Sequence, residues 1–201
     1  TRKVNSILII IRVNTEIEVW DQNKRRLFEQ PKIEYSIRSI KSLINSINLC
    51  QNKYSGLKIK IIILDDSSKD ENLNRIKEVI KDTNGEIISL DTKKFESKIK
   101  KQKTKETFSN LASLFQCFEI GKEIGEDLIF FVEDDYLHFE TMLEEMIATY
   151  ERVSSQVGKD IFMCPADYPY LYMNNEKTNI LIGNKRHWRT ITKTLCTFLT
   201  S

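Results

Sequence analysis

Three short runs of apolar residues constrain the fold of this chain more than any other feature. They are "ILIII" at residues 7–11, "IIIL" at 61–64 and "LIFFV" at 128–132. Each run has the length of a β-strand, and none alternates with polar residues. Such strands must be covered on both faces, as in a sheet that lies between two layers of helices.

The segments between these runs have the periodicity of amphipathic helices. In residues 34–49 the apolar positions recur at intervals of three and four, which places them in one stripe. The same patterns predict further helices at 70–82, 108–124 and 139–153, and further strands at 86–90 and 160–164. This alternation predicts an α/β fold with a largely parallel sheet and helices on both faces.

Length and composition indicate one ordinary globular domain. At 201 residues the chain is long enough for one core and short for two, so we expect a single domain over residues 1–201. A net charge of +2 gives no reason to expect a nucleic acid partner. The chain ends without a polar tail, which leaves a truncation at the C-terminus open.

The cysteines and the apolar runs bear on location. The four cysteines form no CxxC pair and have no histidine at metal-ligand spacing, so we expect free thiols in a reducing compartment. No apolar run approaches the ~20 residues of a membrane span, and the N-terminus has no signal-peptide pattern. We therefore expect no transmembrane segment and a cytoplasmic location, either free or peripheral to the inner membrane.

Acidic residues directly follow two of the three apolar runs. Asp65 and Asp66 follow the second run, and Glu133, Asp134 and Asp135 follow the third. Sheets of this class bind ligands at the carboxyl ends of their strands. Clustered carboxylates repel one another unless a cation lies among them, and Mg²⁺ or Mn²⁺ uses one or two carboxylates together with substrate phosphates. One aspartate of the first pair could instead cap the helix that follows.

Both acidic segments resemble those of a known family. "IIILDDSSKDEN" resembles the "DDGSxDxT" segment of nucleotide-sugar glycosyltransferases of the GT-A type (glycosyltransferase family 2-like), and "DLIFFVEDDYLHFETMLEEMI" resembles their metal-binding strand with its D-x-D motif. The resemblance implies a GT-A (Rossmann-like) fold with a mixed, largely parallel sheet. It further implies Mn²⁺- or Mg²⁺-dependent transfer of a sugar from a nucleoside diphosphate-sugar, with a UDP-sugar favoured. The acceptor would be a hydroxyl group of a glycan or a lipid-linked molecule, in polysaccharide biosynthesis.

The resemblance also implies roles for the acidic residues. Asp65 or Asp66 would contact the nucleotide base, and Glu133 or Asp134 the ribose and sugar. Asp135 would bind the metal that bridges the diphosphate.

Two departures from the family pattern accompany these assignments. Arg12, at the end of the first strand, would be a further donor contact, but a long polar segment at residues 12–32 replaces the short loop of the family. Glu133 stands where an aspartate is more common, and its carboxylate reaches one methylene further.

The C-terminal segment offers further site residues. Tyrosines and prolines surround Asp167, which is the acid we predict as the catalytic base, although a base beyond residue 201 stays open. His187, Trp188 and Arg189 combine a titratable nitrogen, a stacking ring and a phosphate-binding fork. We expect Trp188 and Arg189 to contact the nucleotide-sugar and His187 to contact the metal or diphosphate.

Seven lysines lie in residues 93–105, and two interpretations are open. The segment is either a solvated loop or a mobile flap that closes over an anionic ligand. Only Phe95 and Ile99 could hold such a segment against the protein.

Two other functions are also open. The first is a nucleotide- or sugar-binding module of the same fold without turnover. The second is a signalling receiver domain, in which "IIILDDSS" would be the acid pair beside a phosphoacceptor aspartate. A receiver domain begins with that strand, whereas a complete strand and helix precede it here.

Overall fold

A five-stranded sheet forms the centre of the computed structural model. The structure describes residues 2–16, 29–100, 102, 104–166, 168, 172–173, 177–193 and 196–201. The strands are β1 (Ser6–Val13), β2 (Lys58–Asp65), β3 (Gly85–Ser89), β4 (Leu128–Glu133) and β7 (Phe198–Thr200), in the order β3-β2-β1-β4-β7. The first four are parallel, and β7 is antiparallel to β4. The predicted fold class, a mixed and largely parallel Rossmann-like sheet, is confirmed.

The uninterrupted apolar runs form the strands at the centre of this sheet. In β1 the side chains of Ile7, Ile9 and Ile11 enter one hydrophobic cluster, whereas those of Leu8 and Ile10 enter another on the opposite face. All five are at most 3% exposed. Both faces of β1 are therefore buried, which explains why its sequence does not alternate with polar residues.

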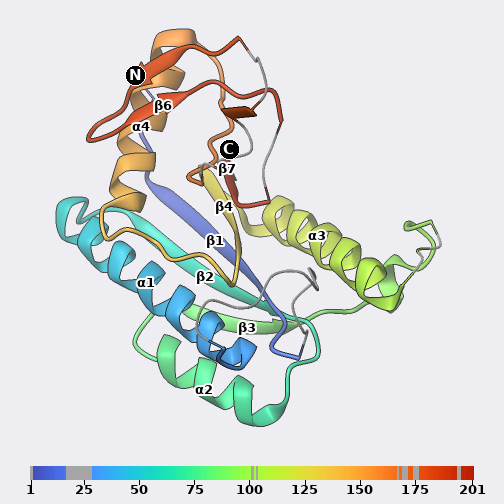
Figure 1. Cartoon of the computed structure of the whole chain (residues 1–201). Coiled ribbons are helices and arrows are strands. Elements are labelled where there is room, and N and C mark those ends of the chain that lie inside the picture. Colours follow the sequence, from blue (N-terminus) through green and yellow to red (C-terminus); the bar gives the residue numbers. More distant parts are fainter. Residues whose placement is uncertain are drawn as a thin grey trace.

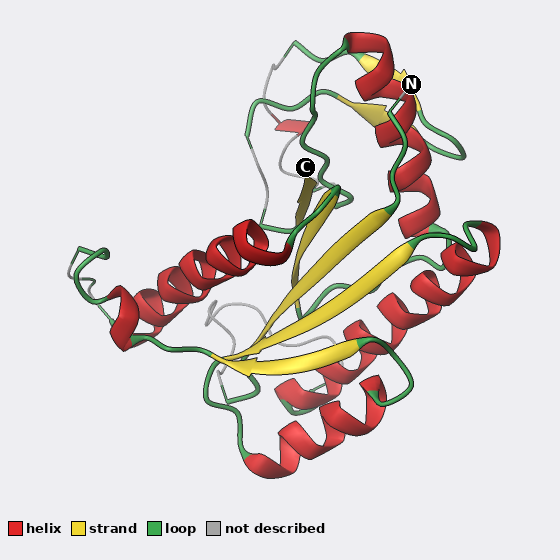
Figure 2. Ribbon diagram, turned by 180° about the vertical axis from the view of Figure 1, so that it is seen from behind, coloured by secondary structure: helices red, strands yellow, loops and turns green. Residues whose placement is uncertain are grey.

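Helices cover both faces of the sheet (Figure 1). On one face lie α1 (Lys32–Lys53), α2 (Asp70–Ile80) and α4 (Met142–Val157), and on the other lies α3 (Lys105–Ile124). Figure 2 shows the same arrangement from behind, with the twist of the strands. The helix α4 ends at Gly158, whose φ of 66° is the left-handed conformation that favours glycine at this position.

Helix α3 begins earlier than the predicted residue 108. The Thr104 hydroxyl accepts a hydrogen bond from the backbone N–H of Thr107, 3.1 Å away, and so caps the first turn. Lys105, which the sequence analysis places in the lysine-rich segment, is the first residue of the helix.

The predicted strand at 160–164 is wrong. Within it only Met163 pairs, through an isolated antiparallel bridge to Leu199. The place beside β4 is taken by β7, a three-residue strand from the C-terminal end of the chain. A second, two-stranded sheet of β5 (Ile180–Ile182) and β6 (His187–Arg189) was not predicted. Strands of three residues are too short to leave a recognisable pattern in the sequence.

The first part of the lysine-rich segment is packed against α3. It contains a 3-10 helix, η1 (Lys93–Phe95). Phe95 is completely buried and, with Ile99 and Ala112, forms a small hydrophobic cluster. Lys94 and Lys98 form ion pairs with Glu119 on α3, at 2.6 and 2.7 Å. The two apolar residues considered at the sequence level as anchors therefore hold residues 93–100 in place; residues 101 and 103 lie outside the described chain.

In the described part of the chain, no helix is long and apolar enough to cross a membrane. All four cysteines are free; Cys50 and Cys117 are buried, and Cys196 is exposed.

Candidate functional site

The carboxyl ends of β1, β2 and β4 surround a cavity of about 160 Å³. In the sheet, β2 and β3 lie on one side of β1, and β4 lies on the other side. Sheets of this type bind ligands at the point where the strand order switches sides in this way. Asp66, Glu133, Asp134 and Asp135 all line the cavity. Two acidic groups that lie almost seventy residues apart in the sequence therefore meet in one place.

Glu133 is paired with Arg12, as neighbours on adjacent strands. The parallel register of β1 and β4 sets these residues side by side. Arg12 Nη2 lies 2.7 Å from Glu133 Oε1, and Arg12 Nη1 donates to Asn110 Oδ1 at 2.6 Å and to Ser113 Oγ at 3.1 Å on α3. Burial raises the pKa of Glu133, while the Arg12 guanidinium opposes that rise. Arg12 therefore lines the cavity of the acids, and its predicted contact with the nucleotide-sugar stays a prediction.

Asp134 is paired with a different cation, on α1. The Asp134 carboxylate accepts hydrogen bonds from Lys32 Nζ, at 2.7 Å, and from the Ser36 hydroxyl. Asp134 is almost completely buried, and this burial raises the pKa of its carboxyl group, although Lys32 and Ser36 act in the opposite direction. Asp134 is thus held by α1, whereas Glu133 is held by Arg12.

Asp135 is the exposed acid of the three. Its side chain is 58% exposed, and its Oδ2 lies 4.0 Å from Lys32 Nζ. The three carboxylates therefore face two cations, Arg12 and Lys32. In the described part of the chain, no three histidine, cysteine or acidic side chains are grouped to hold a metal. Asp135 is the carboxylate of this group that could contribute a ligand to a divalent cation, together with oxygens of a bound molecule and water.

The two aspartates at the end of β2 have different environments. Asp65 is buried and its Oδ2 accepts a hydrogen bond from the Ser68 backbone N–H at 3.2 Å, so it stabilises the turn before α2. Burial raises the pKa of Asp65. Asp66 lines the cavity, where its Oδ2 accepts hydrogen bonds from Asn14 Nδ2, at 3.1 Å, and from the Ser109 hydroxyl. Asp65 therefore holds the turn and does not cap α2, whose N-cap position is Lys69 and has no side-chain cap, and Asp66 is the aspartate at the cavity.

Ser67 occupies an unusual backbone position in this turn. Its φ of 62° is in the left-handed region, which residues with a Cβ rarely adopt. The family segment quoted above has glycine at this point. The turn that orients Asp66 therefore has the backbone conformation that glycine favours, although its residue is serine.

Several residues of the site were missed by the sequence analysis. Lys32 and Ser36 come from α1, and Asn110 and Ser113 come from α3. Both helices were interpreted only through their apolar stripes. The sequence offered one signal for them, a polar residue at a buried position of a helix. Ser36 lies among the buried positions of α1, and its side chain is fully buried.

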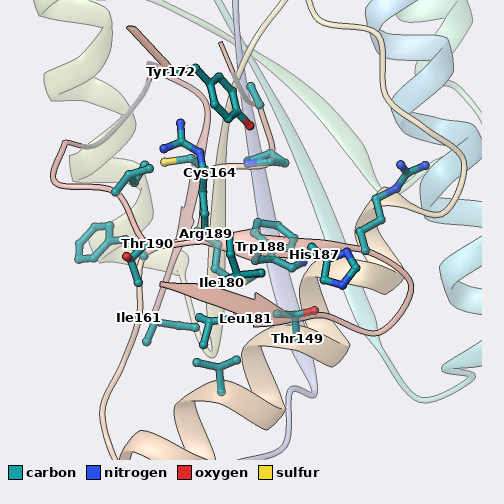
Figure 3. A pocket seen from close by; sticks show the side chains of 17 residues that line it. Thr149, Ile161, Cys164, Tyr172, Ile180, Leu181, His187, Trp188, Arg189 and Thr190 are labelled. Carbon is teal, nitrogen blue, oxygen red and sulfur yellow. The ribbon is translucent and has the colours of Figure 1, made fainter. Parts of the chain in front are cut away.

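The structure does not bring His187, Trp188 and Arg189 together with the acids. These three residues form β6, and they line a separate cavity of about 550 Å³ (Figure 3). Trp188 Nε1 donates to Glu145 Oε1 on α4 at 2.9 Å, and the Lys185 backbone N–H donates to Glu145 Oε2 at 2.5 Å. Glu145 thus fixes the β5–β6 hairpin on α4. The contacts predicted for His187, Trp188 and Arg189 with the nucleotide-sugar, the metal or the diphosphate stay predictions.

Asp167, the predicted catalytic base, lies outside the described residues. Its role stays a prediction.

The similarity of this chain to known proteins is limited. No family model matches this chain, and no curated protein matches it. It is similar to solved structures of glucosyl-3-phosphoglycerate synthase from Mycobacterium tuberculosis. One is a complex with UDP (14% identity, TM-score 0.37, 72% of this chain and 39% of that chain). Another is a complex with Mn²⁺, UDP and phosphoglyceric acid (14% identity, TM-score 0.38, 73% and 39%). The chain spans 39% of the length of these proteins, and a similarity of this extent assigns no role to any of its residues.

Proposed function

We propose that this protein transfers a sugar from a nucleoside diphosphate-sugar to the hydroxyl group of an acceptor, with the help of a divalent metal ion. The observation that carries the proposal is the meeting of Asp66 with Glu133, Asp134 and Asp135 around one cavity at the switch point of the sheet. The two segments that resemble glycosyltransferase motifs are far apart in the sequence, and their shared location is what a common nucleotide-sugar site requires.

The contacts of the acids support a division of roles. Asp66 is the proposed contact to the nucleotide base, because it lines the cavity while Asp65 stabilises a turn. Glu133 and Asp134 are held by Arg12 and Lys32, so they set the shape and charge of the cavity. Arg12 and Lys32 also line it and are positioned to bind the oxygens of a diphosphate.

The metal would bind at Asp135, the exposed carboxylate of the group. A bound Mn²⁺ or Mg²⁺ supplies positive charge that stabilises the leaving diphosphate. Asp135 holds a carboxylate at the edge of the cavity for this purpose. Asp167 is retained as the proposed base that would take the proton of the acceptor hydroxyl.

The binding-module alternative has one observation in its favour. Two of the three acids at the carboxyl end of β4 already have cationic partners within the chain, which leaves Asp135 as the exposed carboxylate. A site of this kind can bind a nucleotide without turning over a sugar donor. Donor hydrolysis distinguishes this function from the transferase.

The receiver alternative does not fit the strand order. Receiver domains have the order 2-1-3-4-5, whereas the order here is β3-β2-β1-β4 with an antiparallel fifth strand. The strand that ends in Asp65 is the second of the sheet in sequence order.

A thermal-shift panel tests the proposal. Nucleoside diphosphates are added to the protein with and without Mn²⁺, because a ligand that binds only the folded state raises its melting temperature. The proposal predicts stabilisation by UDP that increases with Mn²⁺, and release of UDP from a UDP-sugar in a coupled assay. Stabilisation without any release from a set of UDP-sugars would favour the binding module. The absence of stabilisation by every nucleotide would contradict both functions.

A further inference from the structure

Asp135 lies in an irregular segment that joins β4 to α4. We call residues 134–141 the acidic loop; they belong to no helix or strand. Figure 1 shows this loop passing along α1 before it enters α4. Side chains on helices and strands are placed more precisely than side chains on loops, so a ligand on a loop depends on the elements that hold the loop. The contacts of the acidic loop therefore decide where the Asp135 carboxylate lies.

The hydroxyl of Ser42 on α1 binds the backbone of this loop. The backbone N–H of His138 donates to Ser42 Oγ, 3.0 Å away. Ser42 Oγ in turn donates to the backbone carbonyl of Ser39 at 2.8 Å, one turn earlier in the same helix. A hydroxyl has one hydrogen and two lone pairs, so this bond within α1 leaves Ser42 Oγ as an acceptor for the loop. The helix itself thus fixes the orientation of the acceptor.

The acidic loop is held on both sides of Asp135. Before Asp135, the Asp134 side chain is bound to α1 by an ion pair and a hydroxyl. After it, the His138 backbone is bound to α1, and the His138 ring packs edge-on against the ring of Phe130 in β4, with 6.3 Å between the centroids. Loss of either contact would allow Asp135 to move away from the cavity.

A second serine of α1 makes a matching contact outside the loop. The backbone N–H of Leu143, in the first turn of α4, donates to Ser46 Oγ at 3.0 Å. Within the described chain, the N-cap residue Thr141 makes no side-chain cap hydrogen bond, so Ser46 satisfies an N–H group that the start of α4 leaves free. Ser46 is completely buried, whereas Ser42 is half-buried. Both serines accept a backbone N–H, but only Ser42 accepts one from the acidic loop.

We propose that Ser42 is a positioning residue for the metal: its hydroxyl holds the acidic loop and thereby keeps the Asp135 carboxylate at the edge of the cavity. Ser42 is not among the described residues that line the cavity, so it acts through the backbone of the loop. The inference rests on the proposed function, in which Asp135 binds the metal. Replacement of a residue that orients a metal ligand typically changes metal affinity by about 10–100-fold.

Three serine variants test the proposal by calorimetry of UDP binding at increasing Mn²⁺ concentration. In Ser42→Ala, the Mn²⁺ concentration that gives half of the full enhancement should rise about tenfold, while UDP affinity without Mn²⁺ is unchanged. Ser42→Thr keeps the hydroxyl and should behave as the parent does. Ser46→Ala should leave the Mn²⁺ dependence unchanged, although it should lower the melting temperature at least as much as Ser42→Ala, because it leaves a buried N–H without its acceptor.

Hydrogen exchange of the backbone amides tests the contact itself, without nucleotide or metal. Ser42→Ala should accelerate exchange in residues 134–138 as measured by mass spectrometry, because the His138 N–H loses its acceptor. Ser46→Ala should accelerate exchange at the start of α4 and leave residues 134–138 as in the parent.

The two measurements separate this inference from the proposed function. Unchanged exchange in Ser42→Ala would show that Ser42 does not hold the loop. Faster exchange with an unchanged Mn²⁺ dependence would also overturn the positioning role, and the proposed function would stand. An equal rise in the required Mn²⁺ in Ser42→Ala and Ser46→Ala would attribute the effect to lost stability and contradict the proposal. If the parent binds no UDP with Mn²⁺, the proposed function fails, and the role of Ser42 fails with it.

Discussion

Removal of Lys32 should destabilise the protein through the buried carboxylate that it neutralises. In the Lys32–Asp134 pair the side chains are 15% and 9% exposed, with 2.7 Å between Nζ and Oδ1. Loss of one partner of a buried pair costs about 3–5 kcal/mol, because the other charge stays in the interior. The Ser36 hydroxyl still donates to Asp134 in Lys32→Met, so we expect a loss near the lower limit, about 3 kcal/mol. For a domain of this size that corresponds to a melting temperature lower by roughly 6–12 °C.

The pH dependence of the stability loss in Lys32→Met tests whether the Asp134 carboxylate causes it. Burial raises the folded-state pKa of Asp134 above its unfolded value, and loss of Lys32 raises it further. The penalty of the charged carboxylate is therefore fully present above the folded-state pKa and decreases as the pH falls from there toward the unfolded-state pKa. The difference in melting temperature between the parent protein and Lys32→Met should decrease as the pH is lowered from 7.

Two further variants control this experiment. Lys32→Met combined with Asp134→Asn should recover most of the stability, because no buried charge remains. Arg75→Met breaks the exposed ion pair with Glu34 and should cost less than about 1 kcal/mol. A loss below about 1 kcal/mol in Lys32→Met, or one that does not change with pH, would refute the assignment of Lys32 as the partner of a buried charge.

Three other predictions concern the first acidic turn and the lysine-rich segment. Asp65→Ala should lower stability by about 1 kcal/mol, through loss of its hydrogen bond to the Ser68 backbone N–H, and leave UDP binding unchanged, whereas Asp66→Ala should weaken UDP binding, as calorimetry and melting curves will show. Ser67→Gly should raise the free energy of unfolding by up to about 1 kcal/mol, because it relieves a left-handed conformation; a lower melting temperature would contradict this. Phe95→Ala should cost about 3–5 kcal/mol and make residues 93–100 sensitive to trypsin, whereas the parent resists cleavage there; rapid cleavage of the parent would show that Phe95 does not hold the segment.

The strands of the fold were predictable because their signal is local. The runs in β1, β2 and β4 are apolar without interruption, and the sequence identifies each of them within three residues of its observed start and end. The edge of the sheet was not predictable in this way. The segment at 160–164 and β7 are both short and apolar, and only the tertiary contacts decide which of them pairs along β4.

The acidic side chains were identified from the sequence, but their partners were not. Arg12 was expected in the site because it ends a strand, like the acids. Lys32 and Ser36 meet Asp134 across about a hundred residues of sequence, and no local pattern specifies such a contact. His187, Trp188 and Arg189 were assigned from residue type alone, which carries no information about position. Their cavity is separate from that of the acids.

Titration of UDP into the protein with and without Mn²⁺, measured by calorimetry, tests the central claim most directly. The claim is that the cavity at the ends of β1, β2 and β4 binds a nucleoside diphosphate, with a metal at Asp135. We expect Mn²⁺ to strengthen UDP binding by the parent protein. In Asp135→Asn the fold should be intact and the enhancement by Mn²⁺ absent, because an amide is an uncharged and weaker metal ligand. Equal enhancement in both proteins, or no binding of UDP by the parent with Mn²⁺ present, would contradict the account.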